Sequence, residues 1–170
     1  MQRRHPEVLA RSAGLEGWIQ AMWPFEGSPQ ARLAPQGDVG RARMQIDLPE
    51  VVAEVRAAFD RYEKALTTND LDALNSIFRD APQSIRYGIG ENLYGYDQIK
   101  SFRQARAPVG LMRSISQTVI TTYGRDFAVA STLFRRETVP GKVGRQQQSW
   151  VRFPDGWHVV AAHVSLIDEK

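Results

Sequence analysis

Residues 85–96, with the sequence IRYGIGENLYGY, combine side chains that can bind an anion with side chains that can transfer a proton. Glycines and apolar residues separate an arginine, an asparagine and three tyrosines. Arg86 offers paired N–H donors that match a carboxylate, and tyrosine can hold or donate a proton in a partly apolar site. A solvent-exposed loop would more often carry Lys, Ser and Asp. The segment therefore predicts the wall of a small polar pocket.

A long helix before this segment is predicted from hydrophobic periodicity. Residues 47–50 read Asp-Leu-Pro-Glu, which is typical of a helix start capped by Asp47. The helix is expected to continue to about Thr67. Its apolar face comprises Val51, Val55, Phe59, Tyr62 and Leu66, and its water-facing side comprises Arg56, Asp60, Glu63 and Lys64. Tyr62 is therefore predicted to point toward the core.

Two shorter helices and several strands are predicted from the remaining pattern. Asn69-Asp70 indicates the cap of a second helix, and the segment after Arg86 reads as a glycine-containing loop. The predicted helices cover residues 71–78 and 97–106, and the predicted strands cover residues 84–87, 111–123, 127–138, 145–153 and 157–167. Helices first and a long antiparallel meander last indicate an α+β fold, with helices packed on one face of a curved, mostly antiparallel sheet.

Composition narrows the class of protein. The net charge of +3 and the pI of about 9.4 are only mildly basic, and the arginines are scattered among acids, so a nucleic-acid partner is not expected. A secondary interpretation is that several arginines favour a small anionic substrate. No apolar run approaches the roughly 18–20 residues that span a bilayer, and there is no cysteine. We expect a cytoplasmic protein without a membrane partner.

Metal and cofactor chemistry is not predicted. The three histidines, at positions 5, 158 and 163, are dispersed, and no HExxH pattern occurs. No GxSxG elbow of a serine hydrolase occurs either. Any catalysis is therefore expected to use acid–base and electrostatic effects alone.

The chain changes character near residue 44. Residues 1–43 are rich in turn-forming residues and are predicted to be an appended segment, poorly ordered or with one short helix, followed by a single domain over residues 44–170. One interpretation is a start assigned too early, with Met44 as the natural initiator. The alternative is a docking arm that uses Trp18, Trp23 and Phe25.

Four sequence blocks resemble the AtzH/HpxZ-like family, part of the SnoaL-like and nuclear transport factor 2-like superfamily. The blocks are IRYGIGENLYGYDQIKSFRQAR, TVITTYGRDFAVA, GRQQQSW and GWHVVAAHVSL, and the likeness covers Met44 to about Ile167. The resemblance implies a cone-shaped α+β fold. It also implies a decarboxylating amidohydrolase that converts 1,3-dicarboxyurea to allophanate in cyanuric acid catabolism.

The same resemblance implies a catalytic pair, a tyrosine on the first helix and an arginine on the first strand. These fall on Tyr62 in DRYEKAL and on Arg86 in SIRYG. Arg86 is expected to hold a substrate carboxylate, and Tyr62 to protonate the nitrogen as the C–N bond breaks. Asn92 and Tyr94 could bind the ureido core or could equally cap the turn. Direct decarboxylation and attack by water both remain open.

Two further substrate-binding candidates lie in the last two strands. His163 is expected to share a face with Trp157, Val159 and Ala161, and it reads either as a satisfied core histidine or as a pocket residue. Gln147 alternates with Trp150 on the preceding strand and is expected to face inward with Arg145 and Ser149. That row is too polar for a buried face without a ligand, water or subunit interface.

Two other functions remain open at this stage. The chain could be a non-catalytic accessory subunit of a neighbouring amidase, or an isomerase or hydratase of the wider fold. The latter typically needs an inward Asp or Glu, whereas the carboxylates here are expected mostly at helix surfaces and turns. A homodimer through the sheet face is also expected, because Trp and Val on its outer side would otherwise be exposed.

Overall fold

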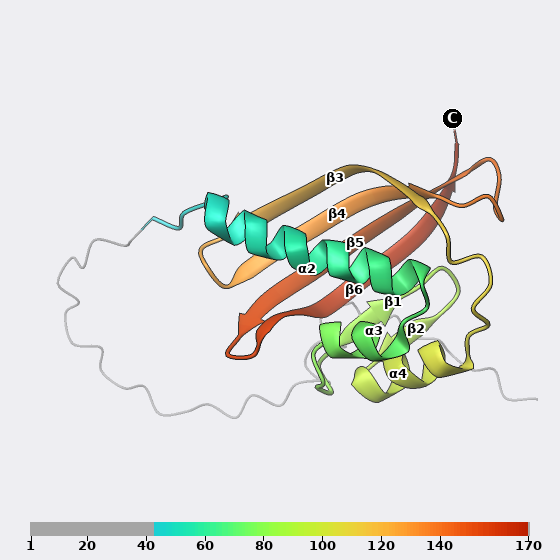
Figure 1. The fold of residues 1–170 in the computed structure, drawn as a ribbon, viewed down its shortest axis with the longest axis horizontal. Coiled ribbons are helices and arrows are strands. Elements are labelled where there is room, and N and C mark those ends of the chain that lie inside the picture. Colours follow the sequence, from blue (N-terminus) through green and yellow to red (C-terminus); the bar gives the residue numbers. More distant parts are fainter. Residues whose placement is uncertain (1–42, 170) are drawn as a thin grey trace, which may run out of the picture. The chain divides into compact units, whose positions relative to one another are not determined.

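The computed structural model describes residues 43–169, in which three helices pack against a six-stranded sheet (Figure 1). The helices are α2 (Pro49–Thr67), α3 (Leu71–Ile77) and α4 (Tyr96–Ala105). Helix α2 lies along the sheet, whereas α3 and α4 lie beside its β1–β2 end (Figure 1). The predicted α+β fold, with helices on one face of a curved sheet, is confirmed.

The sheet has the strand order β2-β1-β6-β5-β4-β3. Its strands are β1 (Ile85–Tyr87), β2 (Asn92–Tyr94), β3 (Ser114–Tyr123), β4 (Phe127–Arg135), β5 (Lys142–Phe153) and β6 (Gly156–Asp168). All neighbours are antiparallel except β1 and β6, which run parallel. This parallel pairing places the short strand of Arg86 beside the last strand of the chain.

The core lies between α2 and the covered face of the sheet, which we call the inner face. The predicted stripe of α2, from Val51 to Leu66, is buried, and Tyr62 is only 5% exposed. The stripe packs against inner-face side chains that include Ala128, Ala130, Trp150 and Val159. Burial of large apolar side chains of this kind contributes about 1.5–3 kcal/mol each. The stripe therefore fixes the helix on the sheet with Tyr62 turned inward.

The predicted cap of α2 is wrong, whereas that of α3 is confirmed. Leu48 is the N-cap of α2 and makes no side-chain cap bond. The carboxylate of Asp47 instead accepts from the backbone N–H of Thr122 at 2.9 Å, and its own N–H donates to the Thr122 carbonyl at 3.1 Å. This pairing ties the helix start to β3. At α3, Asp70 accepts from the N–H of Ala73 at 2.9 Å, as its position predicted.

A bulge in β6 overturns the predicted face of His163. Ser149 pairs with Ala161 but Trp150 pairs with Val159, so Val160 is an extra residue. Val159 therefore faces the core, whereas Ala161 and His163 lie on the opposite, outer face. Ala162 and Val164 continue the buried row. The expectation that His163 shares a face with Val159 is wrong for this reason.

The predicted inward row of β5 is also on the other side of the sheet. Gln146, Gln148 and Trp150 are buried, so Arg145, Gln147 and Ser149 alternate onto the outer face. The tryptophans expected on the outer face lie inside, because Trp150 is fully buried and Trp157 packs against the core cluster. The outer face is consequently more polar than predicted.

The predicted appended segment, residues 1–43, falls outside the described residues except for Arg43. None of the helices in residues 43–169 is long and apolar enough to cross a membrane.

Candidate functional site

Tyr62 presents its phenol to the polar part of the inner face. The hydroxyl donates to Oε1 of Gln146 on β5 at 3.5 Å, which is at the long limit for a hydrogen bond. The ring packs at a tilt against Phe78, with centroids 6.4 Å apart. A buried phenol with one weak partner keeps its oxygen available for a ligand.

The side chain of Gln146, which accepts from the Tyr62 hydroxyl, is held by the ion pair of Arg113 and Glu63. Arg113 donates from Nε and Nη2 to the two carboxylate oxygens of Glu63, at 3.0 and 2.5 Å. The same Nη2 donates to Oε1 of Gln146 at 2.9 Å, and Nε2 of Gln146 donates to Glu63 at 3.1 Å. Because Glu63 is held this way, with a side chain only 12% exposed, the prediction that it faces water is wrong.

Arg86 reaches the inner face from β1. It pairs in register with Leu93 of β2 and with the buried Ala162 of β6. Its Nη1 donates to Oε1 of Glu91, and its guanidinium lies 5.2 Å from the centre of the Phe102 ring on α4. The side chain is only 13% exposed. Arg86 is thus held by an acid and an aromatic ring at the edge of the interior.

Gly88, in the loop after β1, leaves room for the Arg86–Glu91 pair. A Cβ added to Gly88 would overlap the carboxylate of Glu91, so only glycine leaves room for that side chain to fold back. The backbone N–H of Gly90 also donates to Oε2 of Glu91 at 3.1 Å. Gly88 and Glu91 therefore serve the orientation of Arg86.

Five arginines, which we call the inner arginine cluster, gather around Tyr62: Arg86, Arg103, Arg106, Arg113 and Arg136. Burial, together with the charges of Arg86 and Arg106, lowers the pKa of Arg103 to about 10. Burial and the charge of Arg86 lower the pKa of Arg106. Burial followed by the charges of Arg113 and Arg106 lowers that of Arg136. In all three cases Tyr62 acts in the opposite direction and raises the arginine pKa, so its side chain lies near Arg103, Arg106 and Arg136.

Members of the cluster differ in how their charge is balanced. Arg86 and Arg113 have glutamate partners, and Arg103 donates to the Leu74 carbonyl at 2.9 Å while stacking on Phe78. Arg106 and Arg136 form no salt bridge within residues 43–169, and the buried Nε atom of each has no hydrogen-bond partner there. The interior therefore carries an excess of positive charge.

Gln148 is a buried amide without partners. It is 1% exposed, and neither Nε2 nor Oε1 has a hydrogen-bond partner among the described residues. It lies in the same cross-strand row as Arg86, separated from it by Ala162 and followed by Ala130 on β4. An unpaired buried amide costs roughly 1–3 kcal/mol, so the carboxamide of Gln148 keeps its donors and acceptor free for a water molecule or a ligand group.

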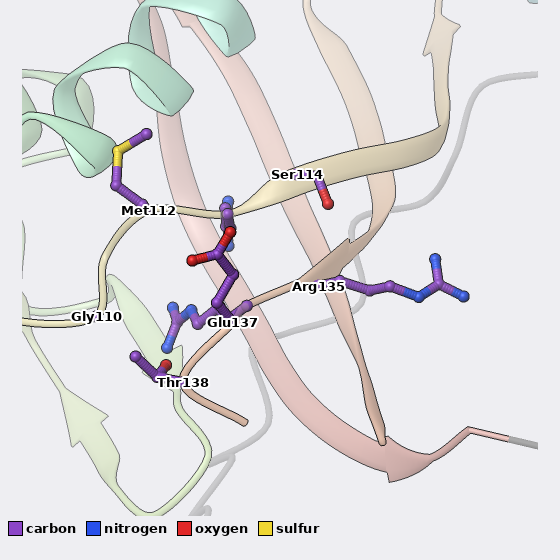
Figure 2. Close-up of a pocket in the computed structure, with 8 residues that line it drawn as sticks. Gly110, Met112, Ser114, Arg135, Glu137 and Thr138 are labelled. Carbon is purple, nitrogen blue, oxygen red and sulfur yellow. The ribbon is translucent and has the colours of Figure 1, made fainter. Parts of the chain in front are cut away.

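A cavity of about 530 Å³ opens beside the cluster, at the start of β3 and the end of β4 (Figure 2). Figure 2 shows that Gly110 and Met112 enter from the segment before β3, whereas Glu137 and Thr138 come from the segment after β4. Arg113 and Arg136 belong to its lining. The side chain of Arg135 extends away from Glu137 in this view. A volume of this size suits a small molecule.

The four predicted substrate-binding residues lie apart from Tyr62 and Arg86. Since Leu93 is the residue paired with Arg86, Asn92 and Tyr94 must project to the outer face. Tyr94 is 55% exposed and its hydroxyl lies 3.3 Å from that of Tyr87. Gln147 and His163 both line two hollows of the outer face, of about 380 and 300 Å³. Their binding roles stay predictions.

Several inner-face residues were missed from the sequence. Glu91 lies within residues 85–96, five residues after Arg86, and this short separation is the signal from which their pairing could be predicted. Gln146 and Gln148 are neighbours of the predicted Gln147, and only the strand register separates them. Arg106 and Arg136 carry no local signal, because an arginine at the end of a helix or strand, here beside Arg135 in the second case, is ordinarily a surface residue.

Comparisons with known proteins agree with this architecture. A crystal structure of a protein of unknown function from Pectobacterium atrosepticum is 52% identical, with a TM-score of 0.72, covering 74% of this chain and all of that one. A cystatin-like fold protein from Burkholderia xenovorans is 45% identical, with a TM-score of 0.72, covering 75% of this chain and all of that one.

A more distant nuclear transport factor 2-like protein from Salmonella enterica is 22% identical, with a TM-score of 0.56 over 71% of this chain and 94% of that one, and shares the fold. No curated protein matches the chain. The family model described as AtzH-like matches residues 44–170. On this match the chain belongs to the AtzH-like family.

Proposed function

We propose that this protein is a cofactor-free decarboxylating amidohydrolase that converts 1,3-dicarboxyurea to allophanate. The observation that carries the proposal is that Tyr62 and Arg86 both present largely buried polar groups to the inner face. The Tyr62 hydroxyl has one weak partner, Gln146, and the Arg86 guanidinium is held by Glu91 and Phe102. Tyr62 and Arg86 are the two residues that the family resemblance assigns to catalysis. A phenol and a surplus of guanidinium groups suit a dianionic substrate that must gain one proton.

The reaction balances with one proton. In the substrate, each carboxylate is bonded to a nitrogen of urea. Cleavage of one C–N bond leaves its electron pair on nitrogen and releases the carboxylate as carbon dioxide. Tyr62 supplies the proton that nitrogen takes up, which gives allophanate, and a water molecule returns a proton to the phenolate. A positioned acid of this kind typically accelerates a step by about 10²–10⁴-fold.

Arg86 and Gln148 supply orientation in this scheme. The guanidinium of Arg86 binds one carboxylate through its remaining N–H donors, and its contacts with Glu91 and Phe102 keep it from moving. The carboxamide of Gln148 has one acceptor and two donor hydrogens, which match the N–H and C=O groups of a urea. It takes the role that the sequence suggested for Asn92.

Glu63 and Glu91 are the carboxylates closest to this site, and each is bonded to an arginine. Their oxygens are occupied by these bonds, so neither is well placed to act as the general base of an isomerase or hydratase. The arrangement therefore favours proton donation by Tyr62 over proton abstraction by a carboxylate.

The proposal is tested by generating 1,3-dicarboxyurea in situ with an upstream amidase and measuring allophanate and carbon dioxide. The wild-type protein is expected to accelerate their formation above the spontaneous rate, and Tyr62→Phe and Arg86→Lys are expected to abolish the acceleration. Tyr123→Phe and Arg125→Lys serve as matched controls, because both residues lie at the exposed β3–β4 end.

No acceleration by the wild-type protein would contradict the proposal. The accessory interpretation would then be examined by a pull-down with the amidase, where Tyr62→Phe and Arg86→Lys should bind as well as the wild type.

A further inference from the structure

Arg106 and Arg136 are the members of the inner arginine cluster that combine the lack of a carboxylate partner in residues 43–169 with a buried Nε that has no hydrogen-bond partner there. Arg106 is the C-cap of α4, and Arg136 directly follows β4. Their guanidinium groups therefore arrive from opposite sides of the interior, one from the helix layer and one from the sheet. Each is half-buried, and each has a buried Nε without a hydrogen-bond partner in residues 43–169.

Both side chains are nevertheless held in place. Nη2 of Arg106 donates to Oδ1 of Asn69, at 3.3 Å, in the turn between α2 and α3. Arg136 lies over the ring of Phe134, 5.1 Å from its centre. A Cβ on Gly144 would overlap that ring, so glycine at this position on β5 allows Phe134 to support the guanidinium. Scaffolding of this kind preorganises a cation for a ligand.

The two groups repel each other and Arg86. The charge of Arg106 contributes to the lowered pKa of Arg136, and the charge of Arg86 contributes to that of both. The charge of neighbouring Arg113 is balanced by its salt bridge with Glu63. The carboxylate nearest in the cavity lining, Glu137, forms no salt bridge with either residue. Half-buried like charges without counter-ions are unfavourable unless a ligand brings the missing negative charge.

We propose that Arg106 and Arg136 bind the second carboxylate of a dianionic substrate while Arg86 binds the first, which makes the site selective for dicarboxylates over monocarboxylates. The inference rests on the proposed function for the identity of the substrate. It adds Arg106 and Arg136 as a pair of specificity-determining residues. They bind the product, allophanate, less strongly than the substrate, because allophanate has lost one carboxylate. Arg136 belongs to the lining of the cavity of about 530 Å³, and Arg86 and Arg106 lie outside that lining.

Glutarate and butyrate are suitable probes. Glutarate has three atoms between its carboxyl carbons, as 1,3-dicarboxyurea has, but no C–N bond to break. Butyrate is the same chain without the second carboxylate. Isothermal titration calorimetry on the full chain is expected to show glutarate binding about 10–100-fold more tightly, the difference made by charge-assisted hydrogen bonds.

In Arg106→Gln and Arg136→Gln, this preference is expected to fall to within a few fold, with butyrate affinity unchanged. Arg136→Lys is expected to retain part of it, and Arg125→Gln, on the exposed end of the sheet, all of it. Circular dichroism establishes that each variant is folded. Equal binding of glutarate and butyrate by the wild type, or an undiminished preference in both Gln variants, would overturn the inference.

Turnover separates this inference from the proposed function. If glutarate is preferred through Arg106 and Arg136 but 1,3-dicarboxyurea is not consumed, the binding site stands and the proposed reaction fails. If 1,3-dicarboxyurea is consumed with an unchanged KM in both Gln variants, the reaction stands and the second-carboxylate site fails. The inference predicts a raised KM with a smaller change in kcat.

Discussion

Gln148→Met is expected to stabilise the empty protein and to weaken ligand binding. Both amide atoms of Gln148 are buried without partners, in a residue that is 1% exposed. Such burial costs roughly 1–3 kcal/mol in protein mutational data. Methionine has a similar length and no polar hydrogen-bonding group to leave unsatisfied, and volume-conserving changes in a core are well tolerated. The free energy of unfolding should therefore rise by about 1–3 kcal/mol.

Thermal unfolding monitored by circular dichroism measures this gain. Each kcal/mol raises Tm by roughly 2–4 °C in a chain of this size. The neighbouring Gln147→Met is the matched control. Gln147 is exposed and donates only to Ser131 Oγ at 3.3 Å, so its replacement should change stability by less than about 0.5 kcal/mol.

The same variant must lose function if Gln148 binds the substrate. Gln148→Met is expected to raise KM for 1,3-dicarboxyurea by about tenfold, the worth of one to two neutral hydrogen bonds, whereas Gln147→Met should leave it unchanged. A lowered Tm together with an unchanged KM would refute the reasoning, because Gln148 would then be a satisfied structural residue.

Three other substitutions test the scaffold. Gly144→Ala should destabilise the protein by about 1–3 kcal/mol, since its Cβ overlaps the ring of buried Phe134, whereas Gly90→Ala, with open space around it, should be close to neutral in urea unfolding. Asp70→Ala should cost about 1 kcal/mol through loss of the α3 cap, and equal stability would show that the cap is dispensable. Ser149→Arg, on the outer face, should convert the predicted homodimer to a monomer in sedimentation equilibrium, and a wild-type monomer at micromolar concentration would contradict the dimer.

The fold was predictable where local patterns and packing agree. The stripe ending at Leu66 has helical spacing and is buried as predicted, and Asp70 caps α3 through a bond between near neighbours. Asp47 departs from its pattern because its carboxylate has a competing partner, the N–H of Thr122, which is far away in sequence. Tertiary pairing of this kind overrides a local capping signal.

The candidate site was predictable only in part, because strand register decides which side chains meet. One extra residue at Val160 moves His163 to the outer face, and alternation then exchanges Gln147 for Gln146 and Gln148. Nothing in the sequence near Arg136 indicates that it meets Arg106. The mild excess of arginine hinted at an anionic ligand, but only the fold gathers the charges.

The measurement that tests the account most directly is the turnover of 1,3-dicarboxyurea by Tyr62→Phe, in a variant shown by calorimetry to bind glutarate as the wild type does. Phenylalanine keeps the ring against Phe78 and removes only the proton donor. The account predicts that kcat falls by about 10²–10⁴-fold while glutarate affinity is retained. Wild-type turnover in Tyr62→Phe would contradict it.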